Sequence, residues 1–217
     1  DVVSKGELMA ALKSKIDPKK IVFSGVGKTY QEIEFAAKKK VLLINAESQS
    51  EIETILKIAK KVNRVIDIGI RLNPNVDAKT IKEITTGKTI NKFGLTEKEV
   101  IGLINHYKKS KYLNIKCLSV HIGSQITSHI PYLKMLKAIQ KIIDKTKFNF
   151  KYIDLGGGMG INYGENNQKL NYKKYSNQID KFVKKNKVKV IFEPGRSIIG
   201  NTGYLLKKII YIKKTNR

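Results

Sequence analysis

The chain has 217 residues, enough to bury a sizeable core in one large or two small domains. It is strongly basic, with 43 Lys and Arg against 18 Asp and Glu and a formal net charge of +25. The basic residues are almost all Lys and are spread over every segment; the few Arg are Arg64, Arg71, Arg196 and Arg217. Because Arg reads phosphates and bases better than Lys does, this even scatter indicates a solvated surface and argues against a nucleic-acid-binding module.

The sequence also disfavours membrane and disulfide-stabilised proteins. It contains no signal-peptide pattern and no apolar run near the roughly 18 residues of a membrane helix, so we predict a cytoplasmic protein without membrane contact. The single cysteine, Cys117, lies in an apolar segment, which predicts a core residue. The chain begins at Asp1 within a strand-like segment and stops soon after another apolar run, from which we expect a piece of a longer protein.

Apolar, β-branched segments alternate with segments of helical periodicity along the chain. Nearly continuous apolar strands, each followed by a helix, predict a parallel sheet covered by helices. The predicted strands are 2–4, 21–24, 41–45, 65–72, 115–121, 151–155 and 188–192. Four predicted helix starts carry the capping-box pattern, a Ser or Thr followed three residues later by Glu. The pairs are Ser4 and Glu7, Thr29 and Glu32, Ser48 and Glu51, and Thr96 and Glu99.

Three consecutive glycines at 156–158 directly follow one of the predicted strands. Glycine lets the backbone approach a ligand and turn successive N–H groups inward, so this stretch predicts a cradle for an anion such as a phosphate. The alternative is a flexible turn that needs φ > 0. Two further polar clusters follow other strands, at 121–125 and 193–196, and three clusters at three strand ends predict one site.

Two architectures fit this alternation, an open doubly wound sheet and a closed (β/α)8 barrel. An open dinucleotide-binding sheet carries its G-x-G-x-x-G turn after the first strand, whereas here the glycines come late. In barrels, phosphate commonly binds to the loops after strands seven and eight. If one strand precedes Asp1, residues 156–158 follow strand seven and residues 193–196 follow strand eight. We therefore predict a (β/α)8 TIM barrel over residues 1–200, here without its first strand.

Residues 201–217 are predicted to begin a separate β domain, because residues 203–212 have the pattern of a strand with no helix after it. The connection 73–94 is the longest on the predicted ligand side, and we expect it to form a wall of the site. A packed loop without contact to a ligand is the alternative.

The chemistry of the three clusters indicates a cofactor with two unlike ends. A carboxylate does not favour a phosphate, so Glu193 is expected to face a cationic group such as a protonated ring nitrogen. Pyridoxal phosphate supplies both groups, and a carboxylate that keeps its ring nitrogen protonated makes the ring an electron sink. Taken singly, His121 has the features of a structural residue, and Glu-Pro-Gly-Arg those of an ordinary turn. No cluster has metal-ligand spacing, so no metal is predicted.

These residues carry a resemblance to the fold type III pyridoxal phosphate decarboxylases, from Asp1 to about Lys213. The matching blocks are Asp1-Val-Val-Ser4, Glu7-Leu8, Ile21-Val-Phe-Ser-Gly-Val-Gly-Lys28, Asn45-Ala-Glu-Ser48, Arg71-Leu-Asn-Pro74, Thr86-Gly87, Asn91-Lys-Phe-Gly94, His121-Ile-Gly-Ser-Gln125, Asp154-Leu-Gly-Gly-Gly158 and Glu193-Pro-Gly-Arg-Ser197. The His-Ile-Gly-Ser-Gln block favours the branch of the family that acts on diaminopimelate over the ornithine-type branch.

The resemblance implies a reaction and a role for each site residue. The reaction is the decarboxylation of meso-diaminopimelate to L-lysine, the last step of lysine biosynthesis, by a homodimeric carboxy-lyase. His121 would stack on the cofactor ring and Glu193 would pair with its nitrogen, which makes these two residues catalytic. Arg196 would lie between the cofactor phosphate and the substrate carboxylate. The implied cofactor-binding residues are His121, Ser124, Gly156, Gly157, Gly158, Glu193, Pro194, Gly195 and Arg196.

The resemblance also implies parts that lie outside the chain. The family's Schiff-base Lys would be upstream of Asp1, and a C-terminal β domain would complete the partner subunit's site, so the chain alone is expected to be inactive. Ile81 stands where many relatives have His. Two rival functions remain: an ornithine-, arginine- or carboxynorspermidine-type decarboxylase of the same fold, and a module that binds pyridoxal phosphate without catalysis.

Overall fold

The computed structural model describes residues 1–77, 93–163 and 169–214. Six parallel strands form one sheet in chain order, β1-β2-β3-β4-β5-β6. Their bounds are β1 (Val22–Phe23), β2 (Leu43–Ala46), β3 (Ile66–Arg71), β4 (Leu113–Ser119), β5 (Tyr152–Asp154) and β6 (Lys189–Ile191). The predicted first strand is reduced to a single parallel bridge between Val2 and Phe23. It is short because Ser4 already caps the following helix.

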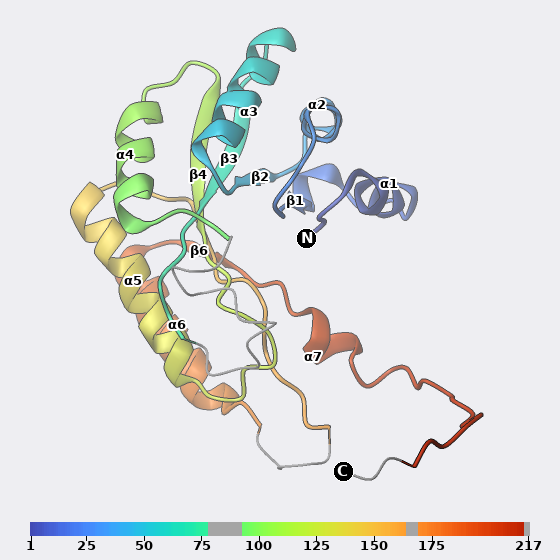
Figure 1. Ribbon diagram of the computed structural model, residues 1–217. Helices are drawn as coiled ribbons and strands as arrows, with labels where there is room; N and C mark the ends of the chain where they lie inside the picture. Colours follow the sequence, from blue (N-terminus) through green and yellow to red (C-terminus); the bar gives the residue numbers. More distant parts are fainter. Residues whose placement is uncertain (78–92, 164–168, 215–217) are drawn as a thin grey trace.

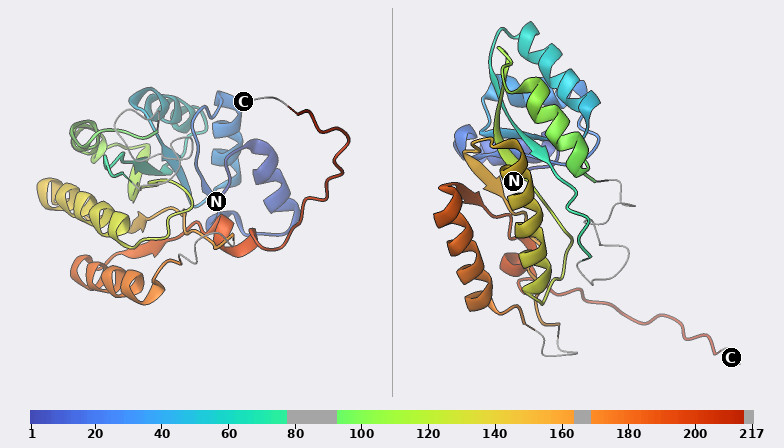
Figure 2. Two further views of the ribbon diagram at one scale, coloured as in Figure 1. Left: turned by 60° about the horizontal axis from the view of Figure 1, so that its bottom comes forward. Right: turned by 90° about the vertical axis from the view of Figure 1, so that its left-hand side faces the viewer.

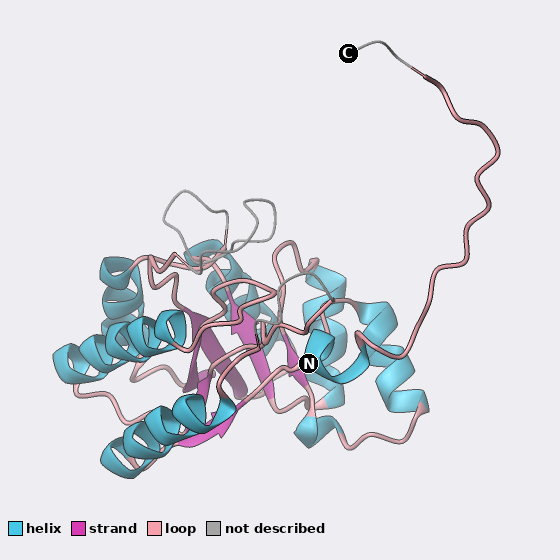
Figure 3. Cartoon of the chain, turned by 90° about the horizontal axis from the view of Figure 1, so that it is seen from below, coloured by secondary structure: helices cyan, strands magenta, loops and turns pink. Residues whose placement is uncertain are grey.

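The helices lie around the outside of the curled sheet, as Figures 1 and 3 show. They are α1 (Lys5–Lys13), α2 (Tyr30–Lys39), α3 (Gln49–Lys61), α4 (Glu97–Tyr107), α5 (Ile130–Thr146), α6 (Tyr172–Asn186) and α7 (Gly195–Ile199), with a 3-10 turn η1 (Pro18–Lys20). A doubly wound sheet would reverse its strand order at a switch point, whereas here the order follows the sequence throughout and the sheet curls (Figure 2). The barrel prediction is therefore confirmed, and within the described residues the sheet is open between the Val2 bridge and β6.

The capping-box prediction is confirmed in full at two helices and in part at two others. Thr29 and Thr96 each exchange both bonds of the box with the Glu three residues later. Ser4 and Ser48 accept the expected backbone bond, but their Glu partners reach one residue further back. Glu7 accepts from the amide of Val3 and Glu51 from that of Glu47, each at 2.8 Å. In all four cases a carboxylate satisfies an amide at the helix start, where negative charge is favoured.

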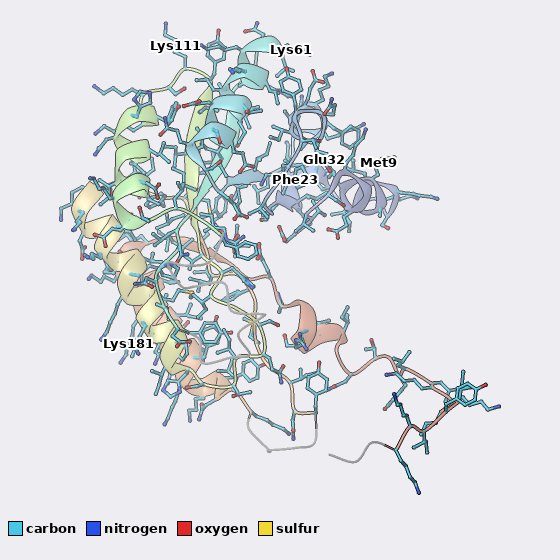
Figure 4. The ribbon with its side chains drawn as sticks, viewed as in Figure 1. Met9, Phe23, Glu32, Lys61, Lys111 and Lys181 are labelled. Carbon is cyan, nitrogen blue, oxygen red and sulfur yellow. The ribbon has the colours of Figure 1, made fainter. Side chains whose placement is uncertain are left out.

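The core consists mainly of Ile, Leu and Val from the strands and from the inner helix faces. Phe23 is fully buried, whereas Lys61, Lys111 and Lys181 are exposed on the outside of the molecule (Figure 4). Cys117 on β4 is fully buried and its burial raises the pKa of the thiol well above the usual value, which confirms that it is a core residue. In the described part of the chain, no helix is long and apolar enough to span a bilayer.

The strand predicted over 203–212 is not formed. These residues contain no helix or strand, and the chain runs away from the barrel (Figure 1). Tyr204 is 99% exposed and Leu206 97%. A strand needs a neighbouring strand to pair its N–H and C=O groups, and among the described residues none lies beside this segment. Its apolar pattern therefore has no partner in this structure.

Candidate active site

Buried polar side chains mark the carboxyl end of the sheet as the functional end. Six polar residues are buried in the described part of the chain: Ser24, Asn45, Glu47, Arg71, Ser119 and Asp154. Each lies at or just after the carboxyl end of a strand from β1 to β5. The opposite end has a cavity of about 320 Å³, lined by residues such as Leu42, Ile66 and Lys116, but none of the predicted site residues contributes to it. Since barrel enzymes carry their chemistry at the carboxyl end, the buried polar groups locate the site better than the cavity does.

The structure brings the three predicted clusters into direct contact. The amide of Gly157, after β5, donates to Nδ1 of His121, after β4, at 3.2 Å. The amide of Glu193, after β6, donates to the carbonyl of Gly156 at 2.9 Å. Arg196 Nε donates to Ser124 Oγ at 3.2 Å. One site is therefore formed by the loops that follow three adjacent strands.

Close packing of these loops is the first reason why the turn at 156–158 consists of glycines. A Cβ on Gly157 would lie 2.1 Å from the carbonyl oxygen of Glu193, and one on Gly158 would lie 2.2 Å from that of Gly123. Gly156 and Gly158 also have φ of +63° and +85°, which side chains rarely adopt. The amides of Gly156 and Gly157 already donate to protein acceptors. Among the described residues, the Gly158 amide is the one amide of this turn without a protein acceptor. The predicted anion cradle therefore offers one backbone N–H group to a ligand instead of three.

Two side chains that the sequence analysis did not single out hold the glycine turn in place. The hydroxyl of Tyr132 on α5 donates to the carbonyl of Gly157 at 3.1 Å, and the Tyr132 ring is fully buried against Tyr175, with centroids 4.5 Å apart. Gln125 binds Ile161 through both of its amide atoms, at 2.6 and 3.2 Å. The turn is thus fixed by bonds from the neighbouring loop and from the helix outside it.

His121 is a neutral imidazole with a defined tautomer. Burial, with a further contribution from the charge of Arg71, lowers the pKa of His121 to about 4. Because Nδ1 accepts the Gly157 N–H, the ring proton is on Nε2. The same bond fixes the plane of the ring beside the glycine turn, as flat stacking on a cofactor ring would require.

The carboxyl group of Glu193 is strongly perturbed by its surroundings. Burial and the neighbouring carboxyl of Asp154 raise the pKa of Glu193 to about 8. Its Oε1 is buried and has no hydrogen-bond partner among the described residues. A buried carboxyl oxygen without a partner is costly, which is the condition expected where a ligand supplies the missing donor.

Arg196 and its neighbours form the cationic side of the site. Its Nη1 donates to the hydroxyl of Tyr163 at 2.6 Å, while its Nε binds Ser124. Pro194 precedes the short helix α7, which starts at Gly195, so both residues serve to place Arg196 one residue later. The linked loops carry the Arg196 guanidinium, the Ser124 hydroxyl and the Gly158 amide. This set of hydrogen-bond donors suits a phosphate.

Arg71 and Glu47 form an ion pair that the sequence analysis did not predict. Arg71, at the end of β3, pairs with Glu47 at 2.7 Å, and both side chains are nearly buried. The other oxygen of Glu47 accepts the amide of Gly94 at 3.2 Å, and the ring of Phe93 lies 5.1 Å from the guanidinium. The signal that could have found this pair is a charged residue inside an apolar run, since unpaired charges are almost never buried.

Lys28 is buried at the same end of the sheet, but its ammonium group is fully engaged. It donates to the carbonyls of Gly25 and Asn45 at 2.5 and 2.9 Å and pairs with Glu51 at 2.7 Å. An imine-forming lysine needs a free lone pair, so these contacts make Lys28 structural.

Some sequence-based expectations cannot be placed. Ile81 and most of the predicted wall at 73–94 fall within residues 78–92, which lie outside the described residues. The described part of the chain contains no group of three or more His, Cys, Asp or Glu side chains that could hold a metal ion.

Comparison with known proteins identifies the family. Residues 1–200 match the family described as pyridoxal-dependent decarboxylase, pyridoxal binding domain. The chain belongs to the pyridoxal-dependent decarboxylases. It is 40% identical to a diaminopimelate decarboxylase from Helicobacter pylori over 217 residues, 99% of this chain and 53% of that protein.

Solved structures agree with this assignment to the pyridoxal-dependent decarboxylases. The structure of H. pylori diaminopimelate decarboxylase complexed with L-lysine has a TM-score of 0.87 and 40% identity, covering 91% of this chain and 51% of that one. The M. jannaschii enzyme in co-complex with L-lysine has a TM-score of 0.85 and 34% identity, covering 99% and 52%. The chain spans about half the length of the curated relatives it matches. The predicted family, fold and pyridoxal cofactor are confirmed, while the roles of individual residues stay predictions.

The residues of this pyridoxal-dependent decarboxylase domain fit the cofactor of its family. The unpartnered Glu193 Oε1 can accept from a protonated ring nitrogen. At the other end, the Gly158 amide, Ser124 and Arg196 supply neutral and cationic donors for a phosphate. The two ends of the site thus have opposite charge preferences, as the two ends of pyridoxal phosphate require.

We predict that Gly157→Ala in the full-length protein weakens binding of pyridoxal 5′-phosphate by about 5- to 150-fold, because the new Cβ would displace the backbone of Glu193 at a cost of about 1–3 kcal/mol. Fluorescence titration with the cofactor measures this. Gly102→Ala is the matched control: nothing lies within 4 Å of its Cβ, so binding should be unchanged and α4 slightly more stable. Normal cofactor affinity of Gly157→Ala would show that the glycine turn is not part of the site.

A second prediction concerns stability. The pKa of Glu193 rises on folding from its ordinary 4.5 to about 8, so the folded state binds more protons than the unfolded state between these values. The free energy of unfolding of the cofactor-free protein should therefore fall as pH rises from 4.5 to about 8. Glu193→Gln should remove this slope and raise Tm by a few degrees at the alkaline end. Thermal unfolding across this pH range tests it, and identical slopes for the two proteins would contradict it.

Proposed function

We propose that the protein containing this chain decarboxylates meso-diaminopimelate to L-lysine with pyridoxal phosphate. The observation that carries the chemistry is the buried, unpartnered oxygen of Glu193 beside the glycine turn and His121. The observation that favours this substrate is the 40% identity, over nearly the whole chain, to a diaminopimelate decarboxylase. The His-Ile-Gly-Ser-Gln sequence at 121–125 supports the same choice.

The proposed residue roles follow from the contacts. When bound, pyridoxal phosphate supplies an electron sink for the electron pair left as the bond to CO2 breaks. Glu193 stabilises the proton on the ring nitrogen, which strengthens that sink. His121, neutral and held by Gly157, covers one ring face and excludes water from it. Because the imidazole carries no charge, it does not compete with Glu193 for the ring proton.

The phosphate end is assigned to the linked loops after β4, β5 and β6. Ser124, the Gly158 amide and Arg196 would hold the phosphate, with Pro194 and Gly195 placing Arg196 in the first turn of α7. Arg196 would also orient the substrate carboxylate, since a guanidinium can bind two anions with different N–H groups. Tyr163 fixes one of these N–H groups at 2.6 Å.

We further propose a homodimer in the cytoplasm and a second, β domain that begins at residues 201–217. The family match ends at residue 200, and the exposed apolar side chains of 203–212 supply the pattern of a strand that needs a partner. A substrate of the ornithine type is the alternative within the fold, and a non-catalytic cofactor-binding module is the alternative outside it.

The function is tested by CO2 release from meso-diaminopimelate, ornithine, arginine, lysine and carboxynorspermidine, each supplied to the full-length protein with pyridoxal phosphate. We expect release from meso-diaminopimelate and formation of L-lysine. Release of CO2 from another of these substrates would assign the protein a different decarboxylase activity of the same family. Cofactor binding without any release would favour the non-catalytic module.

We predict that Arg196→Lys lowers kcat/KM by about 10- to 100-fold, because a single ammonium cannot replace two charge-assisted bonds from a planar group. Both the KM for substrate and the dissociation constant of the cofactor should rise. Arg64→Lys is the matched control, because the Arg64 guanidinium donates to the carbonyl of Ala37 at the opposite end of the sheet, far from the site. Unchanged kinetics in Arg196→Lys would remove this residue from the active site.

A further inference from the structure

Asp154 is a buried carboxyl group that the proposed function does not use. It is the last residue of β5 and its exposed fraction is 0%. Its Oδ1 accepts the amide of Gly156 at 3.0 Å, and its Oδ2 accepts Asn45 Nδ2 at 3.1 Å and Ser119 Oγ at 3.2 Å. Burial raises the pKa of Asp154, and these three neutral donors oppose that effect by favouring its ionised form.

The strand register places Asp154 next to Glu193. Asp154 pairs with Ile191 across the parallel ladder, and Glu193 lies two residues further along the same chain. Residues two apart on an extended segment project to the same side, so both carboxyl groups face the interior. The neighbouring carboxyl of Asp154 adds to the effect of burial in raising the pKa of Glu193. Two ionised carboxylates side by side in a buried site repel each other, so a proton on one of them is favoured.

The surroundings indicate which carboxyl group carries the proton. Asp154 accepts three hydrogen bonds from neutral donors, whereas Oε1 of Glu193 is buried without a hydrogen-bond partner among the described residues. The charge is therefore on Asp154 and the proton on Glu193. Other groups act on the pair from farther away: the guanidinium of Arg71 favours ionisation of Glu193, while Cys117 and His121 are neutral.

We propose that Asp154 and Glu193 form a carboxyl pair that shares one proton. In this pair, Asp154 is the positioning residue that sets the protonation state and the orientation of the Glu193 side chain. This inference rests on the proposed contact of Glu193 with the cofactor ring nitrogen. A pair with one proton has a charge of −1, which neutralises one protonated ring nitrogen in a buried site. Two ionised carboxylates would leave an excess negative charge, which is costly away from water.

The backbone keeps this geometry rigid. The amide of Glu193 donates to the carbonyl of Gly156, which lies two residues after Asp154. At Gly157 the two loops are so close that a Cβ would not fit between them. Gly69 on β3 leaves room for the Asn45 side chain, since a Cβ there would lie 2.0 Å from Asn45 Oδ1. Asn45 in turn donates to Asp154 and to Ser24. Residues from five neighbouring strand segments thus hold the pair.

The test is the carbonyl stretching band of protonated carboxyl groups in the infrared spectrum of the cofactor-free, full-length protein, followed as a function of pH. We expect one band at neutral pH that is lost as pH rises through about 8. It should be absent at neutral pH in Glu193→Gln. In Asp154→Asn the midpoint should fall by about one pH unit or more, because Glu193 loses a negatively charged neighbour.

Ser119→Ala provides a second variant should Asp154→Asn fail to fold. It removes one donor from ionised Asp154 and should raise the lower of the pair's two midpoints, because the first ionisation of the pair places the charge on Asp154. Asp67→Asn is the control, since Asp67 is a partly exposed carboxylate paired with Lys116 at 2.6 Å, and the midpoint should not move. A native protein without a protonated band at neutral pH, or midpoints unmoved in both Asp154→Asn and Ser119→Ala, would overturn the proposal.

This readout separates the inference from the proposed function, because the infrared titration uses neither cofactor nor substrate. A protein that shows the shared proton but releases no CO2 from meso-diaminopimelate would refute the function and keep the carboxyl pair. A second readout in the loaded protein is the pH dependence of absorbance of bound pyridoxal 5′-phosphate. It should shift in the same direction as the infrared midpoint in each variant, and a shift in the opposite direction would contradict the assigned aim of Glu193.

Discussion

The site depends on the contact between backbones at the glycine turn. The loops after β4, β5 and β6 approach so closely that a Cβ on Gly157 would reach the Glu193 carbonyl, and one on Gly158 the Gly123 carbonyl. This approach places His121 beside one amide of the turn and Glu193 beside its first carbonyl. Tyr132 then fixes the turn from outside the sheet. His121 and Glu193 are thus both positioned by main-chain bonds at the glycine turn.

The molecule separates its charges by depth. The many lysines lie on the outside, where solvent and salt screen them, so the net charge of +25 says little about the ligand. The buried charges are paired: Arg71 with Glu47, Lys28 with Glu51. Asp154 and Glu193 are the exception, because two like groups share a site without a cation in direct contact among the described residues. Such an arrangement raises the pKa of a carboxyl group and is typical of functional sites.

The sequence was sufficient for the fold because its signals are local. Strand segments, capping boxes and the late glycines each depend on a few neighbouring residues, and together they indicated the barrel and the three loops. The pairing of Asp154 with Glu193 depends instead on the register of β5 against β6, which no local pattern contains. The Tyr132 anchor has the same origin: its spacing on α5 predicts a core residue, and only the packed helix shows its hydroxyl at Gly157. The strand expected at 203–212 is not formed in this chain, and apolar alternation alone could not show whether a partner strand is present.

The two ends of the site carry opposite charges. His121 is neutral, so it adds a flat surface and no charge. At one end, Arg196 brings a positive charge to Ser124 and the Gly158 amide; at the other, Asp154 and Glu193 hold a single negative charge. A ligand with an anionic and a cationic end gains at both, whereas a dianion or a dication gains at one end and loses at the other. The proposed roles of these groups therefore favour a phosphorylated pyridine through the opposite charges of the two ends, with the glycine turn between them setting its orientation.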